Sequence, residues 1–227
     1  LIVAGGKGLR MGGDLPKQFI PMRGKPLLMH TLEAFHRWDA SARIILVLPE
    51  DHQPYWNMLC KEIGCKVPHA IVKGGDTRFF SVKNGLDWLL AERRRKGEED
   101  SGLSLVAVHD GVRPFVSPEV VEACFDKAAV TGAVIPVVPM IDSLRETDEK
   151  GSHPVDRSRY MAVQTPQVFH LELLTKAYEQ PYSSLFTDDA SVVEAMGHAI
   201  DTVPGDRENI KITTPFDLLI AEAMFAR

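Results

Sequence analysis

A glycine-rich segment near the start of the chain is the part of the sequence best suited to chemistry. Residues 4–18 read AGGKGLRMGGDLPKQ and follow a short apolar run. The glycines at positions 5, 6 and 8 let the backbone bend sharply, and several N–H groups can then approach an anion without side-chain obstruction. The segment is neither a GxxxxGK[ST] loop nor a GxGxxG fingerprint, whose third glycine position is Met11 here. We therefore predict a phosphate cradle at Gly5, Gly6 and Gly8.

Two cations, Arg10 and Lys17, lie on the same segment, and Pro16 stiffens the backbone before Lys17. A triphosphate carries about four negative charges, so a loop that binds one needs fixed cations as well as backbone amides. We predict that Arg10 and Lys17 are catalytic and stabilise the charge that develops as a nucleoside triphosphate reacts. The alternative interpretation is a glycine turn with two surface cations.

The position of one aspartate predicts a metal cofactor. Asp110 follows the apolar run SLVAVH at 104–109. The carboxyl end of a strand beside a phosphate loop is a usual place to hold Mg²⁺, which accepts one or two carboxylates plus phosphate oxygens. We expect Asp110 to be a Mg²⁺ ligand. His109 points to the opposite side of that strand, so we expect a buried, hydrogen-bonded histidine rather than a catalytic one.

The elements that must position these residues alternate along the chain. Short β-rich runs and longer segments of helical period are typical of βα units in a mainly parallel sheet. We predict strands at 1–4, 43–48, 67–72, 104–109, 133–138 and 199–203. We predict helices over Lys25 to Trp38, over Thr77 to Arg95 and from Pro118, the last with Ser117 as its N-cap. The fold class is therefore α/β, with a Rossmann-like sheet.

Residues 140–160 interrupt this alternation. The segment MIDSLRETDEKGSHPVDRSRY is polar, and its DEKG turn joins two extended stretches, which predicts a β-hairpin that projects from the sheet. A lone two-stranded hairpin is marginally stable in water, so it needs a surface to pack on. We expect that surface to be a second copy of the chain, in a homodimer.

The composition argues against several other classes of protein. The formal net charge of −5 disfavours a general nucleic-acid surface, because such proteins usually carry a basic face. No stretch approaches the roughly 18 to 20 apolar residues of a membrane span, and no signal-peptide pattern is visible. The three cysteines form no CxxC pair and suit reduced thiols, so we expect a cytoplasmic protein. The sequence opens LIVA without Met, and we expect that a few preceding residues are missing.

Seven short motifs in order carry a resemblance to a known family. GxGxRM followed by PKQ resembles the nucleotidyltransferases that activate sugar phosphates, in particular the 2-C-methyl-D-erythritol 4-phosphate cytidylyltransferases of isoprenoid synthesis. The other motifs are GGDTRFFSV at 74–82, HDGVRPF at 109–115, PVDRSRY at 154–160, TPQVF at 165–169, TDDAS at 187–191 and NIKIT at 209–213. The resemblance covers nearly the whole chain. It implies one nucleotidyltransferase domain over residues 1–227, with residues 140–160 as a dimerisation arm.

The resemblance implies a cytosine site beside the phosphate cradle. Gly75 and Asp76 follow a predicted strand, at the carboxyl edge where open α/β sheets bind ligands. The family holds the base with this loop, with a serine one helical turn later and with backbone at the end of the first strand. The implied nucleotide-binding residues are Ala4, Gly5, Gly6, Gly8, Gly75, Asp76, Arg78 and Ser81. Asp76 has an alternative interpretation as the N-cap of the helix at Thr77.

The resemblance also implies a site for the phosphate of a sugar alcohol. Its residues are Asp110, Arg113, Ser143, Arg157, Thr165 and Lys211. Ser143 stands where the family often has Thr, which preserves a hydroxyl. Gly111 and Val112 depart from the family's usual DAARP string, and we expect the departures to alter packing more than charge. If the hairpin crosses to a partner subunit, Ser143 and Arg157 serve the partner's site and a monomer is inactive.

The implied reaction transfers CMP from CTP to 2-C-methyl-D-erythritol 4-phosphate and releases pyrophosphate. No general base is required, because a phosphate monoester with a second pKa of about 6 is mostly dianionic at neutral pH. The alternatives are a D-ribitol 5-phosphate cytidylyltransferase, an enzyme that uses UTP, dTTP or GTP, and a non-catalytic nucleotide-binding domain. The Asp156–Arg157 pair and TDDAS favour methylerythritol phosphate over ribitol phosphate, while Arg10 and Lys17 argue against the non-catalytic domain.

Overall fold

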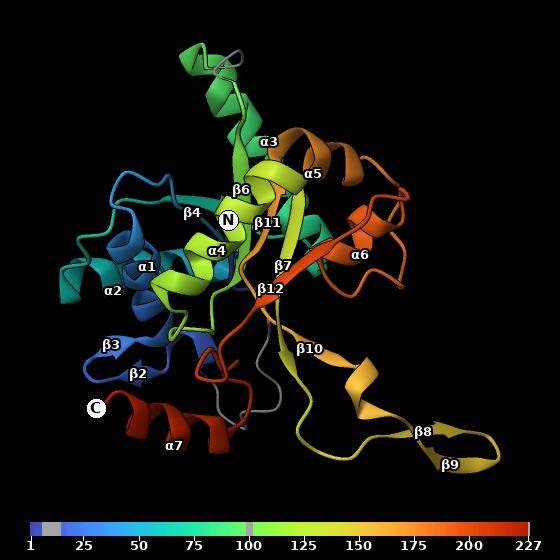
Figure 1. The fold of residues 1–227 in the computed structure, drawn as a ribbon. Coiled ribbons are helices and arrows are strands. Elements are labelled where there is room, and N and C mark those ends of the chain that lie inside the picture. The colour runs from blue at the N-terminus through green and yellow to red at the C-terminus, as the bar shows by residue number, and fades with distance from the viewer. Residues whose placement is uncertain (6–14, 99–101, 227) are drawn as a thin grey trace.

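A mixed sheet forms the centre of the protein (Figure 1). The computed structural model describes residues 1–5, 15–98 and 102–226, and within these the sheet has eight strands. Seven lie in the order β10-β7-β11-β6-β1-β4-β5, and β12 pairs with β7. The strands are β1 Ile2–Val3, β4 Ile45–Leu48, β5 Ala70–Lys73, β6 Leu105–Asp110, β7 Ala133–Pro139, β10 Met161–Val163, β11 Gln167–His170 and β12 Asp201–Pro204.

The predicted α/β class and its six strands are confirmed, with ends that agree within three residues. Strands β6, β1, β4 and β5 are parallel, as βα units require. Two strands of this sheet were not predicted. β11 inserts antiparallel between β6 and β7, and β10 pairs antiparallel with β7 at the edge. Both are too short, at four and three residues, to show a period-two pattern.

Helices cover both faces of the sheet, because alternate strand residues point to opposite sides. Leu46 and Leu48 pack in one apolar core, whereas Ile45 and Val47 pack in another on the other face. The first face carries α1 Leu27–Trp38, α2 Gln53–Ile63 and α4 Pro118–Thr131. The second carries α3 Arg78–Lys96, α5 Leu171–Ala177 and α6 Asp189–Glu194. The carboxyl ends of the parallel strands are left uncovered between these layers.

The helix starts follow from their capping residues. Ser117 caps α4 as predicted, since the Val120 N–H donates to its Oγ at 3.3 Å. Thr77 caps α3, whose Phe80 N–H donates to the Thr77 Oγ1 at 3.4 Å. The alternative interpretation of Asp76 as that cap is therefore wrong.

The predicted helix over Lys25 to Trp38 begins two residues late, at Leu27. Lys25–Pro26 form the short strand β3, which pairs with β2 Pro21–Met22. Beyond the sheet, α7 Pro215–Met224 packs its Ala221 against Met22 and Leu27. In the part of the chain that the structure describes, no helix has the length and apolar character needed to cross a membrane.

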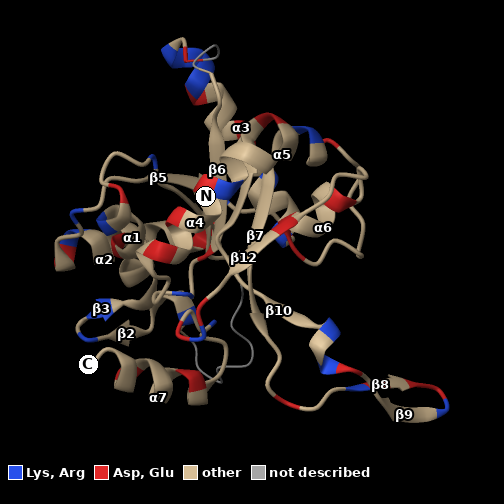
Figure 2. Cartoon of the chain, viewed as in Figure 1, with Lys and Arg blue, Asp and Glu red and all other residues tan. Residues whose placement is uncertain are grey.

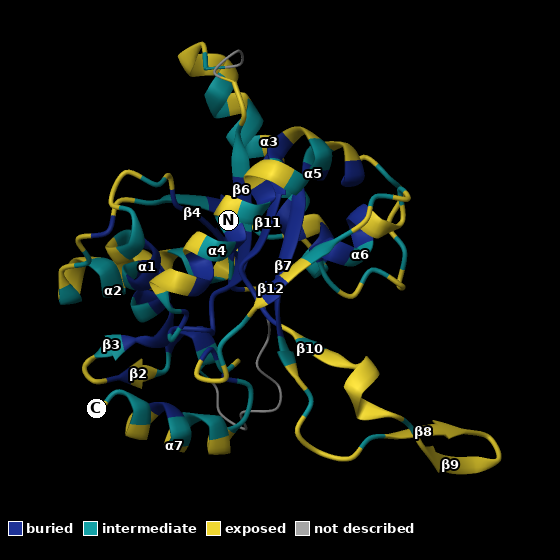
Figure 3. Ribbon diagram, viewed as in Figure 1, coloured by how far each residue is buried: buried dark blue, intermediate teal, exposed yellow. Residues whose placement is uncertain are grey.

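The predicted hairpin is confirmed. Strand β8 Arg145–Asp148 pairs antiparallel with β9 Gly151–Pro154, and the DEKG turn joins them. Every residue of both strands is exposed, and the hairpin projects far from the sheet (Figure 3). A short 3-10 helix, η4 Arg157–Arg159, follows at its base. We call residues 140–160 the arm.

Candidate active site

A cavity of about 780 Å³ lies at the carboxyl ends of β1, β5 and β6. A volume of this size can hold a small-molecule ligand. Among the residues that line it are these predicted site residues: Ala4, Gly5, Lys17, Gly75, Asp76, Arg78, Ser81, Asp110 and Lys211. The fold thus brings most of the described members of the predicted site into one place.

Gln18 anchors the segment that carries Lys17. The Gln18 side chain is buried, and its Nε2 donates to the Ala4 carbonyl at the end of β1, at 3.0 Å. The same nitrogen lies 3.2 Å from Nδ1 of His52. Lys17 begins the 3-10 helix η2 Lys17–Phe19, and the Phe19 ring stacks on buried Trp56, with centroids 6.2 Å apart. The backbone that carries the Lys17 side chain is therefore held in place.

The loop after β5 is fixed by the hydroxyl of Ser81. The Gly75 N–H donates to Ser81 Oγ at 3.1 Å, and that hydroxyl lies 2.9 Å from the Thr77 carbonyl oxygen, to which it donates. A Cβ at position 75 would lie 2.4 Å from the Phe80 Cβ. Only glycine fits there without a shift of the helix start, so the loop stays close to α3 and the cavity stays open.

Asp110 is surrounded by cations. Its Oδ2 lies 2.8 Å from Lys211 Nζ and 3.5 Å from Arg113 Nε, and its Oδ1 lies 3.9 Å from Arg78 Nε. Burial alone would raise the pKa of the Asp110 carboxyl, but Lys211, Arg78 and Arg113 hold that pKa well below its usual range. The carboxylate is ionised at neutral pH. Arg78 also pairs with the buried Asp189, so the cluster holds three cations and two carboxylates, and its positive excess suits a polyanionic ligand.

His109 is buried and hydrogen-bonded, as predicted. The Asp110 N–H donates to Thr165 Oγ1 at 3.1 Å, and that hydroxyl lies 3.0 Å from His109 Nδ1. The hydroxyl therefore donates to Nδ1, and the Nε2–H of the neutral ring donates to the Arg113 carbonyl at 3.0 Å. Burial lowers the pKa of His109 to about 4. The ring is therefore uncharged at neutral pH, and its two hydrogen bonds hold the turn after β6.

Comparison with known proteins decides the family. The family model of 2-C-methyl-D-erythritol 4-phosphate cytidylyltransferase (IspD) matches residues 1–227. The chain belongs to this cytidylyltransferase family. The cytidylyltransferase of that name from Bacteroides fragilis is 56% identical over 224 residues, which cover 99% of this chain and 97% of the relative. The Porphyromonas gingivalis enzyme is 52% identical over 226 residues, with coverage of 99% and 96%.

Solved structures of the family share the fold. The cytidylyltransferase from Thermus thermophilus aligns with a TM-score of 0.72 at 31% identity, over 100% of this chain and 98% of that one. The synthase from Anaerococcus prevotii aligns with a TM-score of 0.78 at 28% identity, over 100% and 94%. The resemblance drawn from the sequence motifs is confirmed.

The departures from the cytidylyltransferase family string at positions 111 and 112 affect packing. A Cβ at Gly111 would lie 2.8 Å from the Ala4 Cβ and 2.9 Å from Leu28 Cδ1. Val112 is buried in the cluster that contains Met22 and Leu27. Neither position alters the charge around Asp110, which agrees with the expectation from the sequence.

The remaining predicted residues fall into three groups. Arg113 and Thr165 lie beneath the cavity, where they contact Asp110, and Arg113 also donates to the Asn209 carbonyl at 2.6 Å. Ser143 and Arg157 are exposed on the arm, which projects from the sheet (Figure 1), and neither lines the cavity; Arg157 donates to the Ile141 carbonyl. Figure 2 shows cations at the base of the arm, where η4 lies. Gly6, Gly8 and Arg10 lie outside the described residues.

Sequence reasoning missed several polar residues that hold the site together. Gln18 and Asp189 are the clearest examples, because both are buried and both hydrogen-bond or pair with predicted site residues. Each lies within a motif of the family resemblance, PKQ or TDDAS, and that was the available signal. A sequence alone does not say which polar side chain of a motif faces inward.

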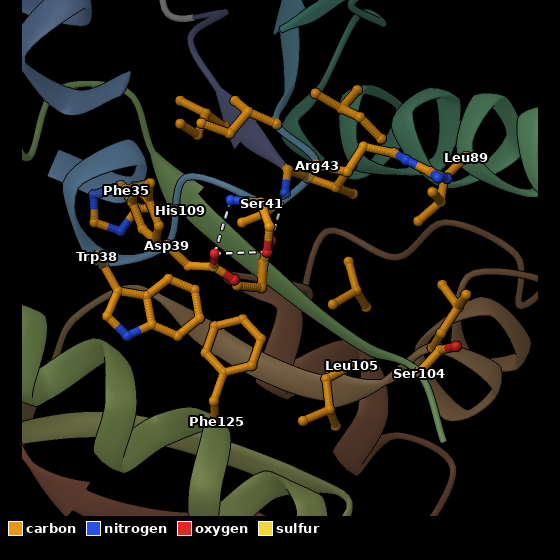
Figure 4. A pocket seen from close by; sticks show the side chains of 18 of the residues that line it. Phe35, Trp38, Asp39, Ser41, Arg43, Leu89, Ser104, Leu105, His109 and Phe125 are labelled. Atoms are coloured by element: carbon orange, nitrogen blue, oxygen red, sulfur yellow. Dashed lines mark hydrogen bonds between the residues drawn. The ribbon is translucent and has the colours of Figure 1, made fainter. Parts of the chain in front are cut away.

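A second cavity, of about 460 Å³, lies near the amino ends of β1 and β6 (Figure 4). Its walls are largely apolar and include Phe35, Trp38 and Phe125. Its two arginines are engaged with Glu98: Arg43 forms an ion pair at 2.8 Å, and Arg93 donates to the Glu98 carbonyl. The cavity therefore offers a polyanion no equivalent of the cluster around Asp110.

The residues of the first cavity fit a metal that arrives with phosphate. Among the described residues no group of three or more His, Cys, Asp or Glu side chains could hold a metal ion. Mg²⁺ needs no such cage when phosphate oxygens provide most of its ligands. Asp110, an ionised carboxylate on the wall of the cavity, fits that mode of binding.

Proposed function

We propose that this chain transfers CMP from CTP to 2-C-methyl-D-erythritol 4-phosphate, in the cytoplasm and in the service of isoprenoid synthesis. The observation that carries the proposal is the cavity at the carboxyl edge of the sheet. It combines the Gly75 and Ser81 loop, which suits a base, with Lys17 and Lys211, which suit phosphates, and Asp110, which suits a metal ion. Family membership over residues 1–227 and the names of the close relatives support the same substrates.

The proposed reaction is an in-line displacement at phosphorus. An oxygen of the phosphate monoester attacks the α-phosphorus of CTP, the new P–O bond forms, and the bond to pyrophosphate breaks. Positioning two anions and neutralising the developing charge supply the catalysis. We assign charge neutralisation to Arg10 and Lys17. His109 takes no part as a base, because it is buried and already bonded to Thr165 and Arg113.

Mg²⁺ is part of the proposal. Asp110 and the triphosphate oxygens would hold the ion, which supplies further neutralisation of phosphate charge when bound. The Lys211 Nζ lies 2.8 Å from Asp110 Oδ2. It is therefore also placed to contact a phosphate of a nucleotide whose metal ion Asp110 would hold. Removal of divalent cations with EDTA should abolish pyrophosphate release, and added Mg²⁺ should restore it.

A homodimer with exchanged arms completes the proposal. Strand β10 is an edge of the sheet, and edge strands carry backbone groups that can pair with another chain. Its Met161 is 47% exposed and its Val163 is 44% exposed, while Ile141 at the base of the arm is 60% exposed. This apolar edge suits a second copy of the chain. Ser143 and Arg157 would then reach the partner's cavity and bind the sugar-alcohol phosphate.

The test is pyrophosphate release with CTP and Mg²⁺, comparing 2-C-methyl-D-erythritol 4-phosphate with D-ribitol 5-phosphate at equal concentration. Release with the first alone is the expected result. Release with the second alone would replace the substrate but keep the site and mechanism. Release with neither would favour a non-catalytic nucleotide-binding protein. Replacing CTP with UTP, dTTP or GTP should abolish release.

A further inference from the structure

A buried carboxylate lies behind the wall of the cavity, next to Arg78. Asp189, the first residue of α6, has no exposed surface. Its Oδ2 lies 2.7 Å from a terminal guanidinium nitrogen of Arg78, and its Oδ1 accepts a hydrogen bond from the Tyr178 hydroxyl at 2.6 Å. Neither Asp189 nor Tyr178 lines the cavity, whereas Arg78 does. The pair therefore contacts the site through Arg78.

Arg78 spans two carboxylates. It is the first residue of α3, and its guanidinium lies between Asp189 and Asp110, the latter 3.9 Å from Nε. A guanidinium is a planar fork, so an ion pair at one nitrogen fixes the direction of the whole group. The closer contact is with Asp189. That contact holds Arg78 at the wall of the cavity and limits its approach to Asp110.

The support behind Asp189 is rigid. Asp188 caps α6, accepting the Ser191 N–H at 2.9 Å, and the Gln167 side chain joins the start of the helix to β11 through Asp188 and the Ala190 N–H. The Tyr178 ring stacks on Phe79, next to Arg78, with centroids 4.7 Å apart. Burial and the nearby Asp189 raise the pKa of Tyr178 well above its usual range, so its hydroxyl stays a donor.

We infer that Asp189, supported by Tyr178, is a positioning residue that sets the affinity for the cytidine nucleotide by fixing Arg78. The inference rests on the proposed function, in which Arg78 binds the nucleotide. An unfixed Arg78 is free to move toward Asp110, where it would disturb the carboxylate expected to meet the metal. The nucleotide would then have to reorder the guanidinium on binding, which weakens affinity.

The first experiment compares two acidic residues of α6, Asp189, which pairs with Arg78, and Glu194, which is exposed. Asp189→Asn keeps the shape of the side chain but removes the ion pair with Arg78, and we expect the Kd of CTP by calorimetry and the KM for CTP to rise about tenfold. Glu194→Gln is the matched control, because Glu194 lies on the same helix, is exposed and does not line the cavity. The control should bind CTP like wild type. Equal CTP affinity in Asp189→Asn and wild type would overturn the inference.

A double-mutant cycle separates positioning from general stability. If Asp189 acts through Arg78, Arg78→Ala with Asp189→Asn should bind CTP no more weakly than Arg78→Ala alone. Additive losses would contradict the inference. If thermal unfolding shows that Asp189→Asn does not fold, Tyr178→Phe replaces it in the same cycle, with a smaller expected loss of severalfold.

The binding readout keeps the inference separate from the proposed reaction. Wild-type protein that binds CTP but releases no pyrophosphate would refute the proposed reaction, and the comparison of CTP affinities would still decide the role of Asp189. Wild-type turnover with unchanged CTP affinity in Asp189→Asn would refute the inference alone.

Discussion

The cavity and the arm are built in opposite ways. Asp110 lies in the cavity beside Lys211, Arg78 and Arg113, and buried contacts hold the two arginines in place. Ser143 and Arg157 lie on an exposed arm. A cavity whose charged groups are already held in place can bind a ligand with little reordering, whereas an exposed arm must be ordered when it binds. If the proposed function holds, one chain supplies a preformed nucleotide site, and its site for the second substrate is completed only by the arm of another copy.

The largest expected effect tests the cavity. Lys17→Ala removes a fixed cation from the cavity, and losing one such contact typically costs about 3 kcal/mol, or about a hundredfold in kcat. The variant should stay folded, because Lys17 is only partly buried. Lys25→Ala is the matched control, since Lys25 pairs with Glu33 on the surface. Near-normal turnover of Lys17→Ala would refute the catalytic role.

The next largest effect tests the arm. Arg157→Ala should cost about 2 kcal/mol in kcat/KM, the value of a hydrogen bond to a charged phosphate. Arg159→Ala, in the same short helix, should be close to wild type. Mixing Arg157→Ala with Lys17→Ala, after exchange of subunits, should restore about a quarter of the wild-type sites if arms cross between copies. No recovery after mixing would show that each arm serves its own chain.

The buried His109 predicts that the stability of the fold depends on pH. The pKa of His109 is lowered to about 4, so the unfolded chain binds a proton below its usual pKa of about 6.5 while the folded chain does not. Stability is therefore lost as pH falls from about 6.5 to about 4, at about 1.4 kcal/mol per pH unit. His109→Gln should flatten this slope in urea unfolding. A slope equal to that of wild type would mean that His109 does not cause it.

The smallest effect refines the role of the arm. Ser143→Ala should raise the KM for the sugar-alcohol phosphate about fivefold, as expected for one hydrogen bond of about 1 kcal/mol. The KM for CTP should not change. Ser143→Thr keeps the hydroxyl and should behave like wild type. A change in the KM for CTP instead would place the arm at the nucleotide half of the site.

The sequence predicted those features that local pattern encodes. The alternation of strands and helices, the Ser117 cap and the hairpin all depend on residues close together in the chain. The motifs then pointed to residues that line the cavity, such as Ser81 and Lys211, but also to Ser143 and Arg157, which do not line it. The insertion of β11 between β6 and β7 was not predicted, because a strand of four residues takes its place from tertiary pairing. The inward direction of Asp189 likewise depends on a helix cap and on Tyr178, both far from Arg78 in the sequence.

The position of β11 has a consequence for the order in which the protein assembles. Strands β6 and β7 are both complete by residue 139, but β11, at Gln167–His170, must pair between them. During synthesis the two parts of the sheet therefore cannot close until the whole arm has emerged. Closure of the sheet therefore requires the residues that follow the arm, but it does not require the arm itself to be folded. Because the entropy of closing a loop grows slowly with its length, residues inserted at the DEKG turn should leave folding nearly undisturbed.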